Sequence, residues 1–355
     1  MKNWPFLLSI FLFIQKSQAQ TSAPEIPKFK LRCREVTLTT PKPTDSLKLK
    51  FTHISVRDER SDTSKLGLFK SALDPEKYKY CLDQGANSQL TTFVNAFFAP
   101  NVDPSSGQHI VMCIRKLWIF ADDTTVKLNA MNSPITRTWL RSEFYLFRDP
   151  YYYPLYRFDS VLTEEGRPRL NSIKLVEKVL VASLQRLKQI DYQTIPGARQ
   201  ITSEQLNNYY SQFNAYPILQ AATIGKGVFE SFMDFRNNRV SDTNFEVRFE
   251  SMSDILYVKD QNGQFYVKRN VWGFSNGENV FIRFGNNFFP LYRHHNTWEF
   301  FGSDKLTESY FGNMFAPSPS RGTVGAPYSD VRLPKLKLAK LQLYQLDMET
   351  GDLIY

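Results

Sequence analysis

Several common catalytic and metal-binding patterns are missing from this 355-residue sequence. It contains no G-x-S-x-G serine motif, no phosphate-binding glycine loop and no H-E-x-x-H pair, which removes frequent signatures of hydrolases, nucleotide-binding proteins and zinc proteases. Its three cysteines show no C-x-x-C spacing, which argues against a dithiol redox motif and a cysteine zinc site. We therefore expect no cofactor and no metal. Whether the protein is an enzyme stays open, and the missing motifs favour a non-enzymatic role.

Long apolar runs are also missing, apart from one short segment near the start of the chain. Lys2 is followed by the apolar run Pro5–Ile14 and by small residues at Ser17 and Ala19. This order is typical of a cleaved signal peptide, and the run has about half of the roughly 20 residues that cross a bilayer. We expect residues 1–19 to be removed and the mature chain, without a transmembrane segment, to be periplasmic or extracellular. The alternative is an uncleaved anchor.

Charge is mildly basic and evenly spread. The chain has 44 Lys and Arg against 35 Asp and Glu, a formal net charge of +9. The basic residues form no concentrated stripe of the kind that lines a nucleic-acid groove, so nucleic acid is not an expected partner. An envelope protein or a glycan is the partner that we expect, and the oligomeric state is open.

The apolar pattern predicts an α+β fold, with an N-terminal sheet covered by two helices and then a β-meander-rich domain. Residues 47–56 partly alternate as a strand, with Leu49 and Phe51 on the face opposite Ile54 and Val56. Two segments have helical spacing, residues 89–98 and residues 172–190, and Ser172 is placed to cap the second. Further strands are expected over residues 109–120, 124–131 and 138–147.

The later part reads as a helix near residue 203 followed by short antiparallel strands. Asn262-Gly263 is a strong hairpin signal, and the chain should close with a hairpin that turns between Met348 and Gly351. Most aromatic residues of this meander are expected in its core. The predicted division is a signal peptide at 1–19, a loose lead-in at 20–45, an α+β domain at 46–197 and a β-rich meander domain at 198–355, with a Pro/Gly loop at 316–334.

The three cysteines suggest one disulfide in an oxidising compartment. Cys113 lies within an apolar strand-like run, where a buried free thiol is expected. Cys33 and Cys81 are then the candidate bridge.

Two stretches resemble known groups of bacterial proteins. The segment Ile54–Asp62, followed by Leu66-Gly67, resembles the opening of small envelope lipoproteins and transporter auxiliary proteins of Gram-negative bacteria, over about residues 47–190. The chain lacks their lipid-bearing cysteine. The segments Gly227–Asn238, Val271–Ile282 and Asp347–Gly351 resemble exported bacterial proteins that have no assigned activity. The resemblance implies a compartment and an architecture, and no mechanism.

The first candidate binding residues are Asp58, Arg60 and Asp62, after the predicted strand. They form either a polar docking patch or a salt-bridged turn, and the turn is favoured because neighbouring arginines lower carboxyl pKa values. The second candidates are Tyr151, Tyr152 and Tyr153, expected in a partly exposed connecting stretch.

Histidine is scarce, with only four in the chain. His294 and His295 are adjacent, so on a strand they would point to opposite faces and could not share one metal ion. A turn would allow them to do so, but a solvated pair is the favoured interpretation.

These observations favour an exported cell-envelope protein that acts by binding or assembly. The alternative is a glycan- or peptidoglycan-directed hydrolase with dispersed carboxylates, such as Asp58 with a distant glutamate, because a carboxylate pair needs no local motif.

The signal-peptide hypothesis predicts the first residue of the mature protein. Amino-terminal sequencing of the native polypeptide should begin at Gln20, because the small residues at Ser17 and Ala19 suit the cleavage enzyme. Recovery of Met1 on protein from the cell interior would contradict the prediction.

Overall fold

The computed structural model shows an α+β fold, as the sequence predicts. The expected signal peptide, the strand at 124–131 and the loop at 316–334 lie outside the described residues. The structure describes residues 31–39, 49–70, 77–82, 86–99, 101–122, 135–165, 168–192, 194–195, 199–250, 253–303 and 342–354.

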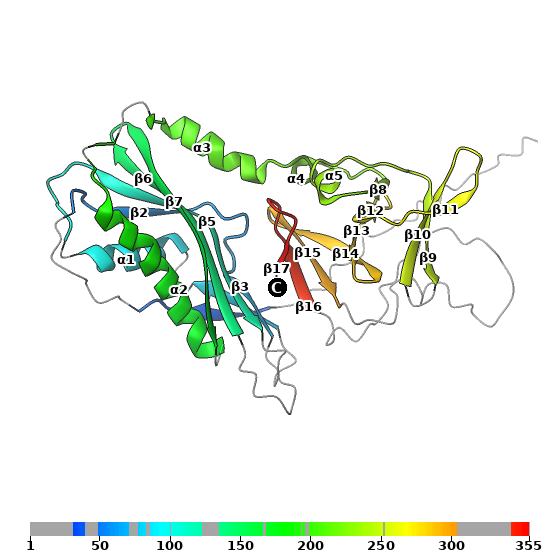
Figure 1. Cartoon of the computed structure of the whole chain (residues 1–355), viewed down its shortest axis with the longest axis horizontal. Helices are drawn as coiled ribbons and strands as arrows, with labels where there is room; N and C mark the ends of the chain where they lie inside the picture. Colours follow the sequence, from blue (N-terminus) through cyan, green and yellow to red (C-terminus); the bar gives the residue numbers. More distant parts are fainter. Residues whose placement is uncertain are drawn as a thin grey trace, which may run out of the picture.

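The first large sheet contains the strands β1 to β7 (Figure 1). Its order is β1-β4-β3-β5-β6-β7, and β2 pairs with β5 beside this path. Strands β5, β6 and β7 form a long antiparallel meander. The strands are β1 (Arg32–Val36), β2 (Ile54–Asp58), β3 (Gly67–Lys70), β4 (Lys77–Leu82), β5 (His109–Asp122), β6 (Ile135–Arg148) and β7 (Tyr151–Glu165).

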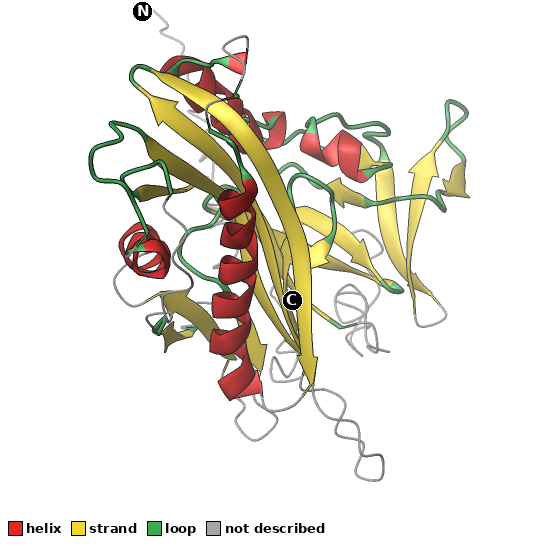
Figure 2. Cartoon of the chain, turned by 60° about the vertical axis from the view of Figure 1, so that its left-hand side comes forward, coloured by secondary structure: helices red, strands yellow, loops and turns green. Residues whose placement is uncertain are grey.

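Two helices cover one face of this sheet, which confirms the predicted layer. They are α1 (Ala86–Phe98) and α2 (Pro168–Gln185), and a 3₁₀ turn at Arg186–Gln189 extends α2. Figure 2 shows the long helix α2 lying along the length of the sheet. The predicted apolar faces of both helices are buried in one core with β5 and β6. The predicted cap at Ser172 is wrong, because α2 begins one turn earlier and the buried Ser172 hydroxyl bonds Tyr80.

The edge of β2 is closed by polar side chains of α1. Asn87, Thr91 and Asn95 lie on successive turns of α1, and their oxygens accept the backbone N–H groups of Asp58, Val56 and Ile54 at 2.8, 3.3 and 2.8 Å. This edge of β2 pairs with no second strand, but its backbone N–H groups still find acceptors. Buried backbone donors need such partners.

The predicted phase of the strand at residues 47–56 is wrong. Leu49, Phe51, Ile54 and Val56 all enter the same core, although strict alternation places them on two faces. The chain bends at residues 50–52 before β2 begins, and this bend shifts the alternation.

Cys33 and Cys81 are joined by a disulfide between β1 and β4, with Cα atoms 5.9 Å apart. Strand β1 lies within the segment 20–45 that the sequence assigns to a loose lead-in, so that assignment is wrong for residues 32–36. Parallel pairing with β4 and the disulfide hold this segment on the sheet. Cys113 is a buried free cysteine, as predicted. Burial raises the pKa of its thiol to about 12, so the thiol stays protonated and is a weak nucleophile.

The later part of the chain builds two further antiparallel sheets. The larger has the order β17-β16-β15-β14-β13-β12-β8, and the smaller has the order β11-β10-β9. Three helices belong to this part of the chain. Helices α3 (Ser203–Ser211) and α4 (Pro217–Gln220) come before β8, and α5 (Phe232–Arg236) lies between β8 and β9. The strands are β8 (Gly227–Phe229), β9 (Phe245–Glu250), β10 (Ser253–Lys259), β11 (Phe265–Val267), β12 (Gly273–Ser275), β13 (Val280–Phe284), β14 (Asn287–His294), β15 (Thr297–Gly302), β16 (Gln342–Leu346) and β17 (Leu353–Ile354).

The predicted hairpins are confirmed. Strands β10 and β11 turn at Asn262-Gly263, where Gly263 has a φ of 81° that favours glycine. The last hairpin, β16–β17, turns at residues 347–351, and its Gly351 has a φ of 86°. Aromatic residues of the meander form its core as expected, with Phe274, Phe288 and Phe300 at most 1% exposed.

The second face of the first sheet is covered by elements from the later part of the chain. Val111 and Tyr145 pack against Leu206 and Tyr210 of α3. Near the other end of β5, Trp118 packs with Leu68, Leu343 and Ile354, so the last hairpin lies on the same face. The first sheet is therefore a central layer between α1–α2 on one side and α3 with β16–β17 on the other.

Among the described residues, no helix has both the length and the apolar character needed for a bilayer crossing.

The disulfide predicts a labelling pattern. Alkylation of the denatured, unreduced protein should modify one cysteine, Cys113, and alkylation after reduction should modify all three. The variant C33A/C81A should lose about 2–4 kcal/mol of stability, because the bridge closes a long loop in the unfolded chain. Three reactive thiols before reduction would exclude the bridge.

Candidate functional site at the junction of the sheets

The predicted candidates Asp58 and Arg60 form a buried ion pair. Both Asp58 oxygens accept from the Arg60 guanidinium at 2.7 Å, and the two side chains are 3% and 5% exposed. The same guanidinium donates to the carbonyl oxygens of Lys65 at 2.7 Å and Thr63 at 3.4 Å. Arg60 therefore fixes the loop after β2. Both oxygens of Asp58 are engaged by this arginine.

Asp62, the third candidate of this group, belongs to a separate buried cluster. Its carboxylate lies 3.0 Å from the ammonium of Lys65, which also pairs with Glu299 of β15. Burial raises the pKa of Asp62, but the nearby Lys65 charge and hydrogen bonds from Ser64 outweigh it and lower the pKa to about 2. Lys65 thus connects the loop after β2 to the second large sheet, because it pairs with the ionised Asp62 in the loop and with Glu299 in the sheet.

A bulge in β5 places two consecutive cations on the outer face of the first sheet. The pairing with β6 shifts between Ile114 and Lys116, whereas Ile114 and Leu117 both face the helix-covered core. A bulge adds one residue to a strand and re-aims the side chains around it. Arg115 and Lys116 consequently both point toward the last hairpin.

The turn of the last hairpin brings acidic groups to these cations. Asp347 pairs with Lys116, and Glu349 accepts from Arg115 at 3.0 Å and from Arg141 of β6 at 2.9 Å. Asp347 also accepts the backbone N–H of Glu349 at 2.9 Å, which shapes the turn. These charge-assisted contacts join residues more than two hundred positions apart.

Glu143 of β6 gathers a second polar cluster on the same face. Its oxygens accept from Tyr210 at 2.6 Å, Tyr145 at 3.0 Å, Tyr209 at 3.0 Å and Arg157 at 2.9 Å. Burial raises its pKa, but hydrogen bonds from Tyr210, Arg157 and Tyr145 outweigh it, so the pKa lies below its ordinary value. Burial raises the pKa of Tyr210, which stays a protonated donor. The carboxylate of Glu143 therefore anchors helix α3 to the first sheet.

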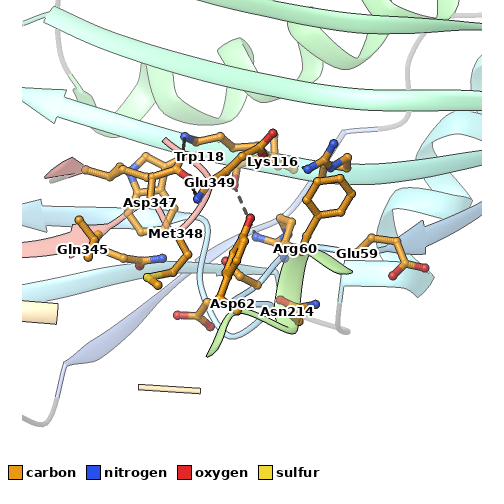
Figure 3. Close-up of a pocket in the computed structure, with 17 residues that line it drawn as sticks. Glu59, Arg60, Asp62, Lys116, Trp118, Asn214, Gln345, Asp347, Met348 and Glu349 are labelled. Atoms are coloured by element: carbon orange, nitrogen blue, oxygen red, sulfur yellow. Dashed lines mark hydrogen bonds and ion pairs between the residues drawn. The ribbon is translucent and has the colours of Figure 1, made fainter. Parts of the chain in front are cut away.

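A cavity of about 70 Å³ lies between the loop after β2, strand β5, the segment after α3 and the last hairpin (Figure 3). Ligand pockets are typically ~300–1,000 Å³, so this one has room for a few water molecules or a small ion. Every carboxylate that lines it is ion-paired. The pairs are Glu59 with Arg57, Asp62 with Lys65, Asp347 with Lys116, and Glu349 with Arg115 and Arg141.

Two of these carboxylates, Asp62 and Asp347, are poor general acids. A glycosidase needs one carboxyl group whose pKa is raised so that it carries a proton near neutral pH. Burial also raises the pKa of Asp347, but the charge of Lys116 outweighs it and the pKa lies below the ordinary value, as it does for Asp62. We call the contact of the last hairpin and the segment after α3 with β5 and the loop after β2 the junction. Its carboxylates serve to pair with buried cations.

The candidate tyrosines Tyr151, Tyr152 and Tyr153 form the start of strand β7, so their placement in a connecting stretch is wrong. The turn at Asp149-Pro150 is tight enough for β7 to begin at once. All three side chains are half-buried. Tyr152 packs on Phe147 with ring centroids 4.8 Å apart, and its backbone pairs with Ile201.

His294 and His295 meet at a turn and are both exposed, in agreement with the favoured interpretation of a solvated pair. His294 ends β14, His295 lies in the two-residue turn to β15, and their ring centroids are 4.4 Å apart. Both rings lie beside Asp62. The turn thus brings together residues that the sequence keeps 232 positions apart.

No protein-family model and no curated protein matches this sequence. A crystal structure of a Xanthomonas campestris protein from the family model DUF330 aligns over 46% of this chain and 99% of its own, with a TM-score of 0.31 and 13% identity. A TM-score of this size does not establish a shared fold, so no function is transferred from that protein.

Sequence reasoning missed Arg115, Glu143 and Glu349. Each is a single charged residue without a local motif, and only the pairing of distant segments brings it to the junction. One signal was present, because Asp347–Gly351 was singled out by its resemblance, although without a role.

The Glu143 cluster predicts a strong, pH-dependent loss of stability in Glu143→Gln. An amide cannot match the charge of Glu143, which is 8% exposed and accepts from Arg157 and three tyrosines, so the loss of these charge-assisted hydrogen bonds should cost about 2 kcal/mol at neutral pH. Because the native pKa of Glu143 lies below 4.5, its contribution is present above that pH and is lost as the pH falls through the native value. Urea unfolding at several pH values measures the difference between wild type and variant, which should shrink in acid.

Glu164→Gln is the matched control. Glu164 pairs with Lys178 at the surface, with side chains 32% and 57% exposed, so the change should stay within about 0.5 kcal/mol. Equal losses in the two variants would contradict a special role for Glu143.

Proposed function

We propose that this chain is an exported protein of the cell envelope that acts by binding or assembly. The sequence of residues 1–19 and the Cys33–Cys81 disulfide support export, because disulfides persist in oxidising compartments. The ion-paired carboxylates Asp62 and Asp347, whose pKa values lie below the ordinary value, weigh against the hydrolase alternative at this place in the fold.

The observation that carries the proposal is the outer edge of β7. This strand is 15 residues long and pairs along its length with β6 on one side. On its other side, within the described part of the chain, only the bridge between Tyr152 and Ile201 is formed. An edge of this kind presents unpaired backbone groups that can receive a strand from another chain.

The usable part of this edge is Tyr156–Glu165. Pro154 has no N–H to offer, and the register shift opposite Phe144 and Tyr145 interrupts the strand near residue 155. The candidate tyrosines therefore lie in the part of β7 whose outer edge is not available to a partner strand. The available part, Tyr156–Glu165, follows them and is called the open run below.

The two faces of the open run suit a particular kind of partner. Phe158 and Leu162 are half-buried at the rim of the core beneath α2. Residues 157, 159, 161, 163 and 165 are exposed on the other face and include charged side chains. An extended polypeptide with apolar residues toward α2 and polar residues on the opposite face would continue both layers.

Val161→Lys tests the proposal. Val161 is 47% exposed at the middle of the open run, and a lysine on a strand edge opposes pairing with another strand. Recovery of the partner from envelope fractions with the tag-free mature protein should fall about tenfold, equivalent to ~1.4 kcal/mol. The melting temperature should be unchanged, because the side chain is exposed.

Val267→Lys is the matched control. Val267 is 43% exposed on β11, which is the edge strand of a different sheet. It should retain the partner that Val161→Lys loses. Equal recovery with both variants, or loss with Val267→Lys alone, would exclude the β7 edge as the binding surface.

A further inference from the structure

The turn between β14 and β15 lies against the loop that follows β2, and three metal-ligating side chains meet there. They are Asp62, His294 and His295, whose ligand atoms all lie within 4.8 Å of one another. The Asp62 side chain is 1% exposed, and the His294 side chain is 45% exposed. The cluster therefore has a buried carboxylate at its base and imidazoles open to solvent.

The spacing fits a tetrahedral ion. Zinc binds histidine nitrogen and carboxylate oxygen at about 2.0–2.2 Å, which puts neighbouring ligand atoms of a tetrahedron roughly 3.4 Å apart. Nδ1 of His294 lies 3.6 Å from Oδ2 of Asp62. The remaining ligand atoms lie within 4.8 Å of one another, so binding would draw them closer together.

The backbone of the turn aims His295 back toward its neighbour. His295 is the first residue of the two-residue turn and has a φ of 52°, a conformation in which hairpins usually place glycine. Its ring meets the ring of His294 edge to face, at an interplanar angle of 76°. The turn thus holds two nitrogen ligands over the same carboxylate.

The charges around the cluster leave room for a cation. Lys65 opposes one, since its ammonium lies 3.0 Å from the same Asp62 oxygen. Glu299 compensates, because it already pairs with Lys65 and its Oε1 lies 3.8 Å from Nδ1 of His294. With neutral imidazoles, two carboxylates face one ammonium, so the net charge is negative and Lys65 keeps a partner when Asp62 binds an ion.

We propose that Asp62, His294 and His295 form a zinc-binding site. Two imidazoles and one carboxylate are ligands that zinc accepts, and the exposed side of the cluster leaves the fourth position to water. A bound ion would join the loop after β2 to the β14–β15 turn, beside the ion pair that Lys65 makes with Glu299. The site is independent of the strand-binding edge of β7.

Zinc titration by calorimetry of the tag-free mature chain tests this site. The four histidines of the chain form two pairs, so two double variants remove equal numbers of imidazoles. His53 and His109 stack on each other with centroids 4.6 Å apart, and neither belongs to this cluster. The comparison is between H294A/H295A and H53A/H109A, with circular dichroism to confirm that both are folded.

Wild type and H53A/H109A should bind one zinc ion per chain with similar affinity. H294A/H295A should lose more than the roughly 10–100-fold that removal of an outer partner costs a metal site, because two direct ligands are gone. Zinc should also raise the melting temperature of wild type and of H53A/H109A, and should leave that of H294A/H295A unchanged.

Two results would overturn the site. One is equal zinc affinity of wild type and H294A/H295A, and the other is loss of binding in H53A/H109A with retention in H294A/H295A. Asp62→Asn gives a further check, since it removes the ligand charge while keeping the shape of the side chain. If folded, it should bind zinc more weakly than wild type, and unchanged affinity would also overturn the proposal.

Discussion

The bulge in β5 is the constraint on which the junction depends. It turns Arg115 and Lys116 to the same face of the sheet, so two positive charges stand side by side where strict alternation would place one. Both are largely buried, with side chains 6% and 11% exposed. Buried charges of one sign are costly unless opposite charges reach them, and Asp347 and Glu349 do so from the last hairpin.

The same logic extends along the outer face of the first sheet. The inner face is covered by the apolar stripes of α1 and α2, and the apolar contacts of these stripes are not directional. On the outer face the apolar clusters are small, and Glu143 and the junction cations lie between them. Directional contacts therefore determine where α3 and the last hairpin lie, because a charge-assisted hydrogen bond forms only when the carboxylate has the right distance and orientation to the cation.

Much of the architecture follows from local patterns. The helical spacing of Leu90, Phe93 and Val94 and the turn at Asn262-Gly263 depend on neighbours in sequence, and both predictions are confirmed. The residues of the site follow from contacts between distant segments. Nothing near Glu143 indicates that Tyr209 and Tyr210 will bond to it, since those tyrosines arrive on a different element.

The failed expectation for residues 47–56 has a physical cause. The strand phase at Leu49 and Phe51 assumed unbroken alternation. A bend at residues 50–52 breaks that alternation, and a single displaced residue reverses every face that follows. The division into domains at residue 197 stays a prediction.

The distance along the chain between the junction partners has a consequence for synthesis. Lys116 and Asp347 are 231 residues apart. At translation rates of about 5–20 residues per second, Asp347 is therefore synthesised on the order of 10–50 s after Lys116. An apolar sheet surface left open for that time would attract other unfinished chains. The outer face of this sheet carries apolar clusters, but Arg115, Lys116 and Arg141 give it a positive charge that opposes the association of two unfinished chains until the acidic turn has been made.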